Sequence, residues 1–130
     1  MRANIQRLYL AVLLVSVYAS CPLFGATKAP ATQIGTAVYY SDKMDGKPVK
    51  MKGEKYDRNA LTAATHRGYP LGSMLRVTNL SNNKSVTVKV NDRMSPRAKP
   101  VIDLSRKAAE ELDMIKPGHV KVKIELLPEK

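Results

Sequence analysis

A short stretch between residues 86 and 93 constrains the fold of this chain more than any other. Valines alternate with polar residues from Val86 to Val90, which is the two-residue period of a half-buried β-strand. The strand runs directly into Asn91-Asp92-Arg93, where Asn and Asp favour a turn because their side chains bond to nearby backbone groups. We therefore expect Asp92 at the end of a strand, where a rigid scaffold can present a reactive carboxylate.

The remaining regular structure is also mainly β. Residues 35–40, 74–80 and 120–126 are rich in β-branched or alternating apolar residues and are expected to be strands. The run 81–84 is expected to close a hairpin, because Asn tolerates the left-handed conformation of a tight turn. Several short strands without long repeats predict a small β-barrel.

One helix is expected over residues 105–115, where alanine, leucine and isoleucine recur at helical spacing. Asp103 or Ser105 would cap its N-terminus, because both side chains can accept a hydrogen bond from the first helical N–H groups. Lys116-Pro117-Gly118 would end it, since proline and glycine stop helices.

The N-terminal region has the features of an export signal. Residues 1–26 contain two arginines and an apolar run from Leu8 to Ala19, which is too short for a membrane span but suits a signal peptide. The alternative is a first amphipathic helix, although the run has no polar face. Residues 27–34 are expected to form a tether, and residues 35–127 the folded domain.

The only cysteine is Cys21, directly after the apolar run. The sequence Tyr18-Ala19-Ser20-Cys21 is similar to a bacterial lipoprotein cleavage site, with tyrosine where leucine is usual. A lipidated Cys21 would anchor the protein to a membrane, and an unmodified one would leave it soluble; both interpretations stay open. In either case no disulfide can form within the domain, so its core must stabilise it.

Several motifs together resemble the RlpA-like double-psi β-barrel family. They read GEKYD at 53–57, TAATH at 62–66, YPLGS at 69–73, NDR at 91–93 and IDLS at 102–105. The step from Asp92 to Asp103 is eleven residues. This resemblance implies a six-stranded double-psi β-barrel with one or two short helices.

The resemblance also implies an activity and its residues. Glu54, His66 and Asp92 match positions linked to lytic transglycosylase action, which cleaves MurNAc–GlcNAc bonds of peptidoglycan and leaves 1,6-anhydroMurNAc ends. That reaction needs a carboxyl group that gives up a proton near neutral pH and then accepts one. We expect Asp92 to have this role, with Glu54 as the partner carboxylate.

Other residues are candidates for binding or structural roles. Tyr39 or Tyr40 would stack on a sugar ring, although a core tyrosine is an equal alternative. Arg93 would bind a carboxylate of the glycan or pair with Asp103. Asp103 itself is expected to be structural, as a helix cap or as a lock on the loop that crosses the barrel.

The chain departs from the family pattern at three places. Residues 49–52 lack the threonine, alanine and asparagine that are usual before Gly53-Glu54, and like the change at Met94 they flank the expected cleft. One residue is inserted before the histidine, so either Thr65 takes the histidine position or Thr65 is the insertion and His66 fills it; the spacing to Asp92 favours His66. Met94-Ser95 replaces the Gly-Pro of the family. If that glycine has a positive φ, Met94 is strained or the loop follows another path.

The formal net charge is +11, and loss of residues 1–26 leaves +9. This charge suits an anionic polymer, and export disfavours nucleic acid, so peptidoglycan glycan strands are the expected partner. The chain is expected to act as a monomer in the bacterial cell envelope (the periplasm), without cofactor or metal, since His66 and His119 lack ligand spacing. The alternatives are a non-catalytic, expansin-like glycan-binding barrel and a basic envelope protein that binds lipid.

Overall fold

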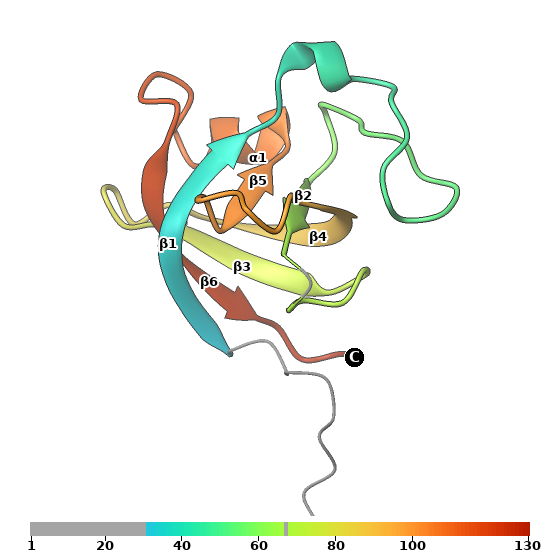
Figure 1. The fold of residues 1–130 in the computed structure, drawn as a ribbon. Coiled ribbons are helices and arrows are strands. Elements are labelled where there is room, and N and C mark those ends of the chain that lie inside the picture. Colours follow the sequence, from blue (N-terminus) through green and yellow to red (C-terminus); the bar gives the residue numbers. More distant parts are fainter. Residues whose placement is uncertain (1–30, 67) are drawn as a thin grey trace, which may run out of the picture.

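Six strands close into a barrel in the computed structural model, which describes residues 31–66 and 68–130 (Figure 1). The expected signal peptide, Cys21 and the first part of the expected tether lie outside these residues. The elements in chain order are β1 (Thr32–Tyr39), the 3-10 turn η1 (Asp42–Met44), β2 (Thr62–Thr65), β3 (Met74–Asn79), β4 (Ser85–Arg93), β5 (Ile102–Leu104), α1 (Arg106–Glu111) and β6 (Val120–Leu126).

The strand order around the barrel is β1-β5-β2-β4-β3-β6. Two pairs, β1 with β5 and β2 with β4, are parallel, and the other neighbours are antiparallel. Closure leaves no strand edge without a partner, so the backbone groups of every strand can be satisfied within the sheet. The prediction of a mainly β, six-stranded barrel with one or two short helices is confirmed.

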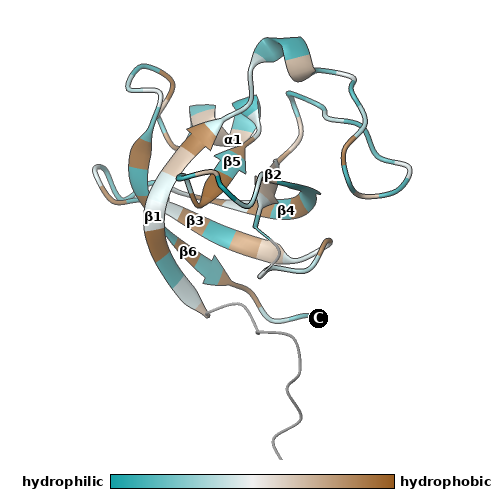
Figure 2. Ribbon diagram, viewed as in Figure 1, coloured by the Kyte–Doolittle hydropathy of each residue, from teal (hydrophilic) through white to brown (hydrophobic). Residues whose placement is uncertain are grey.

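The core lies inside the barrel and follows from the alternation in the sequence. Leu75 and Val77 of β3, Val88 of β4, and Val122 and Ile124 of β6 are all fully buried. Their neighbours along each strand are exposed or half-buried. Figure 2 shows the corresponding alternation of hydrophobic and hydrophilic residues as bands along β6. Within the described residues, no helix is long and apolar enough to span a membrane.

The first strand begins earlier than the sequence pattern predicts. β1 starts at Thr32 rather than at residue 35, and residues expected to belong to the tether pair with β6, Thr32 with Glu125 and Ile34 with Lys123. Ile34 is 63% exposed, so the strand gains backbone pairing there rather than side-chain burial.

The helix is shorter than the expected 105–115. Ser105 caps it, because its side chain accepts a hydrogen bond from the Ala108 N–H at 3.3 Å, so the cap is Ser105 and not Asp103. The helix ends at Glu111, and Asp113 follows in the left-handed conformation with φ of 53°. The chain therefore leaves the helical path before it reaches Pro117.

The hairpin between β3 and β4 is as the sequence predicts. Asn83 has φ of 60°, the left-handed conformation that asparagine tolerates. Met94 does not have the positive φ that would strain it. In the described chain, the non-glycine residues with positive φ are Asn83 and Asp113. The Met94 N–H donates to the Thr65 carbonyl at 3.1 Å, so the end of β4 stays bonded to β2.

Candidate active site

A β-bulge in β4 sets the direction of Asp92. Along the parallel pair of β2 and β4, Ala63 faces Val90 but Ala64 faces Asp92, so Asn91 is an extra residue in β4. Bulges of this kind re-aim the side chains that follow them. Asp92 therefore lies beside Ala64, at the strand end where the sequence predicted it.

Both carboxylate oxygens of Asp92 accept hydrogen bonds. Oδ2 accepts from the Tyr40 hydroxyl at 2.5 Å, and Oδ1 accepts from the Lys50 backbone N–H at 3.0 Å. Burial, followed by this hydrogen bond to Asp92, raises the pKa of Tyr40, so its hydroxyl stays protonated and remains a donor. The carboxylate is held by one residue after β1 and one in the loop between η1 and β2.

A small cluster of apolar side chains packs beside Asp92. Tyr40 stacks on Tyr56 with ring centroids 4.4 Å apart, and both rings are buried against Ala64. Met94 packs against this group from the half-buried rim. An open cleft of about 990 Å³ adjoins it, lined by Lys50, His66, Arg93, Met94, Ser95 and Pro96.

Glu54 supports the bulge, and its hydrogen-bond partners are residues other than Asp92. Its carboxylate accepts from Lys89 Nζ at 2.5 Å and from Asn91 Nδ2 at 3.1 Å. These hydrogen bonds, that of Lys89 first, lower the pKa of Glu54. Glu54 is therefore an ionised group that fixes Asn91, the extra residue of the bulge, and through it the direction of Asp92.

His66, rather than Thr65, reaches the cleft. Thr65 is fully buried in β2, whereas His66 follows the strand, is half-buried and lines the cleft. The His66 Nε2 lies 3.2 Å from the Pro100 carbonyl oxygen. In the described part of the chain, no hydrogen bond joins His66 to Asp92.

Arg93 lines the cleft and also holds the loop after β2. Its Nη1 donates to the carbonyl oxygens of Tyr69 at 2.6 Å and His66 at 3.2 Å. Tyr39 lies elsewhere: its hydroxyl donates to the Ile115 carbonyl at 3.0 Å, and its ring packs against the main core. Of the two tyrosines considered from the sequence, the structure brings Tyr40 to Asp92 and leaves Tyr39 away from it.

Asp103 is a second carboxyl group close to Asp92. Ala64 pairs with Asp103 of β5 on one side and with Asp92 of β4 on the other. Burial, and then the negative charge of Asp92, raise the pKa of Asp103 to about 6. Its Oδ1 is buried and has no hydrogen-bond partner in the described structure.

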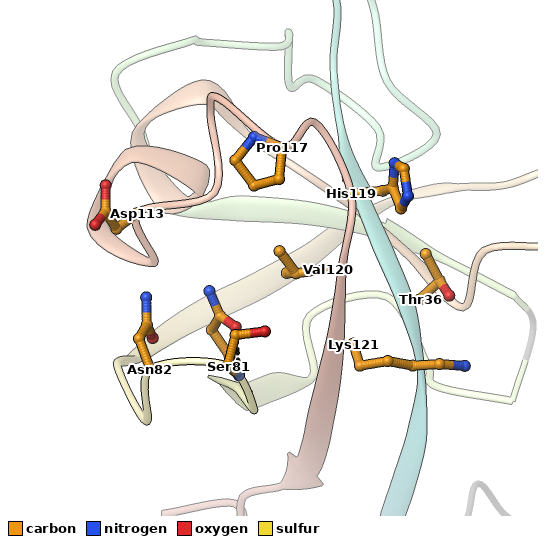
Figure 3. Close-up of a pocket in the computed structure, with 9 residues that line it drawn as sticks. Thr36, Ser81, Asn82, Asp113, Pro117, His119, Val120 and Lys121 are labelled. Carbon is orange, nitrogen blue, oxygen red and sulfur yellow. Dashed lines mark hydrogen bonds between the residues drawn. The ribbon is translucent and has the colours of Figure 1, made fainter.

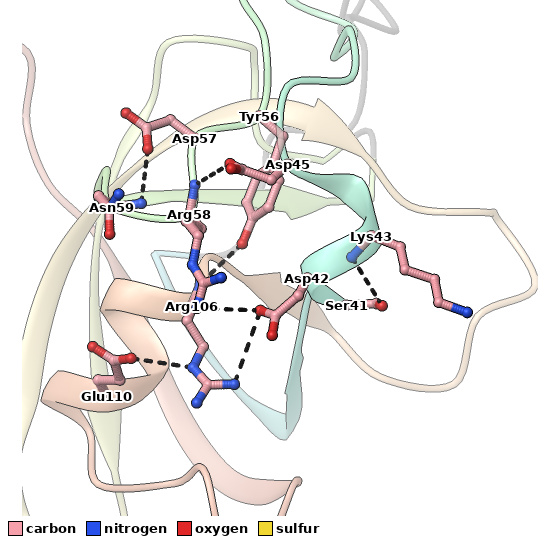
Figure 4. Close-up of polar contacts among 10 residues, drawn as sticks. All are labelled: Ser41, Asp42, Lys43, Asp45, Tyr56, Asp57, Arg58, Asn59, Arg106 and Glu110. Atoms are coloured by element: carbon pink, nitrogen blue, oxygen red, sulfur yellow. Dashed lines mark hydrogen bonds and ion pairs between the residues drawn. The ribbon is translucent and has the colours of Figure 1, made fainter.

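A network of charged residues holds the loop that supplies Lys50 and Glu54 (Figure 4). Asp42 of η1 lies 3.6 Å from Arg58 and 4.0 Å from Arg106, and the Arg106 N–H donates to the Tyr56 hydroxyl at 3.1 Å. The Arg58 N–H donates to Asp45 at 3.0 Å. These contacts fasten the start and the end of the loop to α1.

A second pocket, of about 500 Å³, contains none of the residues discussed above as candidates for catalysis (Figure 3). Side chains of β6, of the hairpin between β3 and β4 and of the segment after α1 line it, among them Asn82, Asp113, His119 and Lys121.

The family model described as lytic transglycolase matches residues 32–124, which is all but the last two residues of the barrel and includes the site just described. This chain belongs to the lytic transglycolase family. The match confirms the resemblance found in the motifs, including the double-psi barrel.

Bacterial relatives are similar over about three quarters of the chain. The chain is 45% identical over 96 residues to the endolytic peptidoglycan transglycosylase RlpA of Campylobacter jejuni, covering 74% of this chain and 34% of that protein. It is 46% identical over 99 residues to the protein of the same name from Rickettsia felis, covering 75% and 43%. The chain thus spans less than half the length of these relatives.

Solved structures show the same fold at lower identity. The Streptomyces papain inhibitor superimposes with a TM-score of 0.62 and 22% identity, over 78% of this chain and all of that one. The Clavibacter michiganensis expansin gives a TM-score of 0.59 and 19% identity, over 76% of this chain and 52% of that one. At this level of identity the comparison concerns the barrel alone.

Proposed function

We propose that this chain is a lytic transglycosylase that cleaves MurNAc–GlcNAc bonds in peptidoglycan glycan strands and leaves 1,6-anhydroMurNAc ends. One observation carries the proposal: a bulge in β4 places Asp92 directly before Arg93 and Met94, which line an open cleft, in a barrel about 45% identical to endolytic peptidoglycan transglycosylases. A carboxyl group in such a position can exchange protons with a bound sugar.

The chemistry needs two proton transfers and no water. A proton must reach the glycosidic oxygen as the C1–O bond breaks, and the C6 hydroxyl of the same sugar must lose its proton as O6 bonds to C1. This differs from two-carboxylate glycoside hydrolysis only in the nucleophile, which is the sugar's own hydroxyl. We assign Asp92 to the second transfer, the removal of the proton from the C6 hydroxyl.

The other predicted residues have supporting roles in this proposal. Glu54 fixes the bulge through Asn91, as its hydrogen bonds indicate, and so positions Asp92. His66 and Arg93 line the cleft, where they can contact the polar groups of a glycan. The Tyr40 hydroxyl orients Asp92.

The proposed substrate sets the location. Peptidoglycan lies in the cell envelope, so the chain would act there after export through its predicted leader. A lipidated Cys21 would in addition anchor the barrel to a membrane. Mass spectrometry of the protein recovered from cells would show a lipid on Cys21, cleavage before it, or an intact N-terminus.

A second candidate is a barrel that binds glycan strands without cutting them. It is favoured by the fact that both oxygens of Asp92 already accept hydrogen bonds from the protein. Substrate would have to displace or share these donors before Asp92 could exchange a proton with the sugar.

Incubation of the full chain with purified peptidoglycan, with and without stem peptides, separates the two candidates. Mass spectrometry of the products should show anhydro-muropeptides or anhydro-glycans. Asp92→Asn should lower their rate of formation by about 10²-fold or more. Asp113→Asn, which changes an exposed aspartate beside the second pocket, should leave the rate unchanged. Intact glycan that still binds the protein would support the binding barrel and contradict the enzyme.

A further inference from the structure

We propose that Asp103 holds the proton that the reaction needs, and that Asp92 is its ionised partner. The two residues would form a carboxyl pair in which one member supplies a proton and the other removes one. This assignment rests on the proposed function and deepens it, because it names a proton donor other than Asp92 and other than Glu54.

The barrel places the two carboxyl groups in one row. Ala64 of β2 lies between them: it is directly opposite Asp103 of β5 on one side and Asp92 of β4 on the other. The three side chains therefore share one face of the sheet. Two strand spacings separate the outer residues, roughly 10 Å between their Cα atoms. Alanine is the only side chain of this row between them, and its single methyl group does not screen one carboxyl group from the other.

The surroundings of the two groups contrast. Both oxygens of Asp92 accept hydrogen bonds, one from a tyrosine hydroxyl and one from a backbone N–H. Asp103 has one buried oxygen without a donor, which disfavours charge. Pairs of carboxyl groups with contrasting surroundings divide acid and base roles between them.

The titratable groups that face Asp103 do not neutralise its charge. Asp92 lies across Ala64, and Tyr40 and Tyr56 are near enough for the charge of Asp103 to raise the pKa of each hydroxyl. Among the ion pairs within the described chain, none includes Asp103. No cation in these ion pairs therefore opposes the burial and the Asp92 charge that raise the pKa of Asp103.

Glu54 cannot take the same role in its present contacts. Lys89 and Asn91 both donate to its carboxylate, and its pKa is lowered rather than raised. A proton donor must hold its proton near the working pH, which these contacts oppose.

The resulting step balances without a co-reactant. The Asp103 proton passes to the glycosidic oxygen and the C1–O bond breaks. The Asp92 carboxylate takes the proton of the C6 hydroxyl while O6 bonds to C1. Asp92 then releases this proton and Asp103 regains one from solvent, so no water is consumed.

The first test needs no cleavage. Carboxyl ¹³C NMR titration of the full chain should show Asp103 titrating near pH 6 in the wild type. Asp92→Asn should lower that midpoint, because the neighbouring negative charge is gone, and Asp113→Asn should leave it unchanged. Titration of Asp103 at the usual aspartate value of about 4, or a midpoint that Asp92→Asn does not move, would overturn the pair.

The second test follows the rate of anhydro-product formation against pH. The wild-type rate should fall as pH rises above about 6, and Asp103→Asn should lower it by about 10²-fold and remove that fall. Asp103→Glu, which keeps a carboxyl group, should restore part of the rate. Full activity with the wild-type pH profile in Asp103→Asn would overturn the proposal. If Asp103→Asn does not fold, the NMR titration of the wild type decides the matter.

The two tests distinguish failure of the carboxyl pair from failure of the proposed function. Cleavage that persists while Asp103 titrates normally would overturn the carboxyl pair and leave the proposed function standing. Absence of cleavage by the wild type would overturn the proposed function and, with it, the role of this proton in catalysis.

Discussion

Asp103 is also a residue at which folding stability should depend on pH. Its pKa is about 6 in the folded protein and about 3.9 in an unfolded chain, so the folded state binds more protons between these values. The free energy of unfolding therefore falls as pH rises from about 4 to 6, and the loss is complete above pH 6. At about 1.4 kcal/mol per pKa unit, the loss is up to about 3 kcal/mol.

Asp103→Asn should remove this penalty. At pH 7 the variant should have a higher free energy of unfolding than the wild type, whereas at pH 4 the two should be nearly equal, because wild-type Asp103 is then protonated when folded. Urea unfolding at the two pH values measures this, with Asp113→Asn as the control for loss of one acidic residue. A variant that is less stable at pH 7 would contradict the predicted linkage.

Tyr40 provides a second test at this scale. Tyr40→Phe removes the hydroxyl that donates to Asp92 but keeps the ring stacked on Tyr56. A hydrogen bond to a charged group contributes about 1.5–3 kcal/mol, so the rate of glycan cleavage should fall about tenfold or more.

The matched control is Tyr69→Phe. The Tyr69 hydroxyl also belongs to a buried tyrosine and donates to Gln33 at 3.2 Å, away from Asp92. Both variants should lose some thermal stability, but only Tyr40→Phe should lose activity. Equal rates in the two variants would show that the Tyr40 hydroxyl does not act on Asp92.

At the scale of elements, β1 passes very close to the segment before β5. A Cβ atom at Gly35 would lie 2.4 Å from Val101 Cγ1, which is inside van der Waals contact. Gly35→Ala should therefore lower the free energy of unfolding by about 1–3 kcal/mol through overpacking. The double variant with Val101→Ala should recover part of this loss, because the smaller side chain gives the new methyl group room. Denaturant unfolding measures these changes. If the losses of the two single variants simply add in the double variant, the strain does not lie between residues 35 and 101.

The sequence predicts the long strands better than the short ones. β3, β4 and β6 alternate apolar and polar residues over six or more positions, so their period is clear. β2 consists of four small buried residues and β5 of three residues, and neither is long enough to show a period. Their places in the barrel come from pairing with distant strands, two of these pairs being parallel.

The same limit applies to the site. Asp92 at a strand end follows from local sequence, because the valine alternation stops directly before Asn91-Asp92-Arg93. The position of Asp103 beside it follows from the register of three strands on both sides of Ala64, which no local pattern encodes. Tyr40 and Tyr39 are adjacent in sequence, and only the structure shows which of them meets Asp92.

At the scale of the whole molecule, one loop beside the cleft presents several exposed lysines. Five exposed lysines (Lys43, Lys47, Lys50, Lys52 and Lys55) lie in the loop that also bonds to Asp92. An anionic glycan strand would be attracted to this surface, and added salt would screen that attraction.

Replacing Lys47, Lys52 and Lys55 with glutamine should therefore weaken glycan binding several-fold and reduce its salt dependence. The control replaces Lys84, Lys116 and Lys121, which lie at or beside residues of the second pocket, and changes the net charge equally. Sedimentation of the protein with insoluble peptidoglycan at several salt concentrations measures both. Equal weakening in the two sets would mean that net charge matters and the loop does not.

The most direct test of the proposed chemistry is digestion of peptidoglycan by the full chain in H₂¹⁸O. The new MurNAc ends should carry no ¹⁸O and should lack the mass of one water molecule, because the C6 hydroxyl closes the ring in place of water. Reducing ends that contain ¹⁸O would show hydrolysis and contradict the transglycosylase assignment.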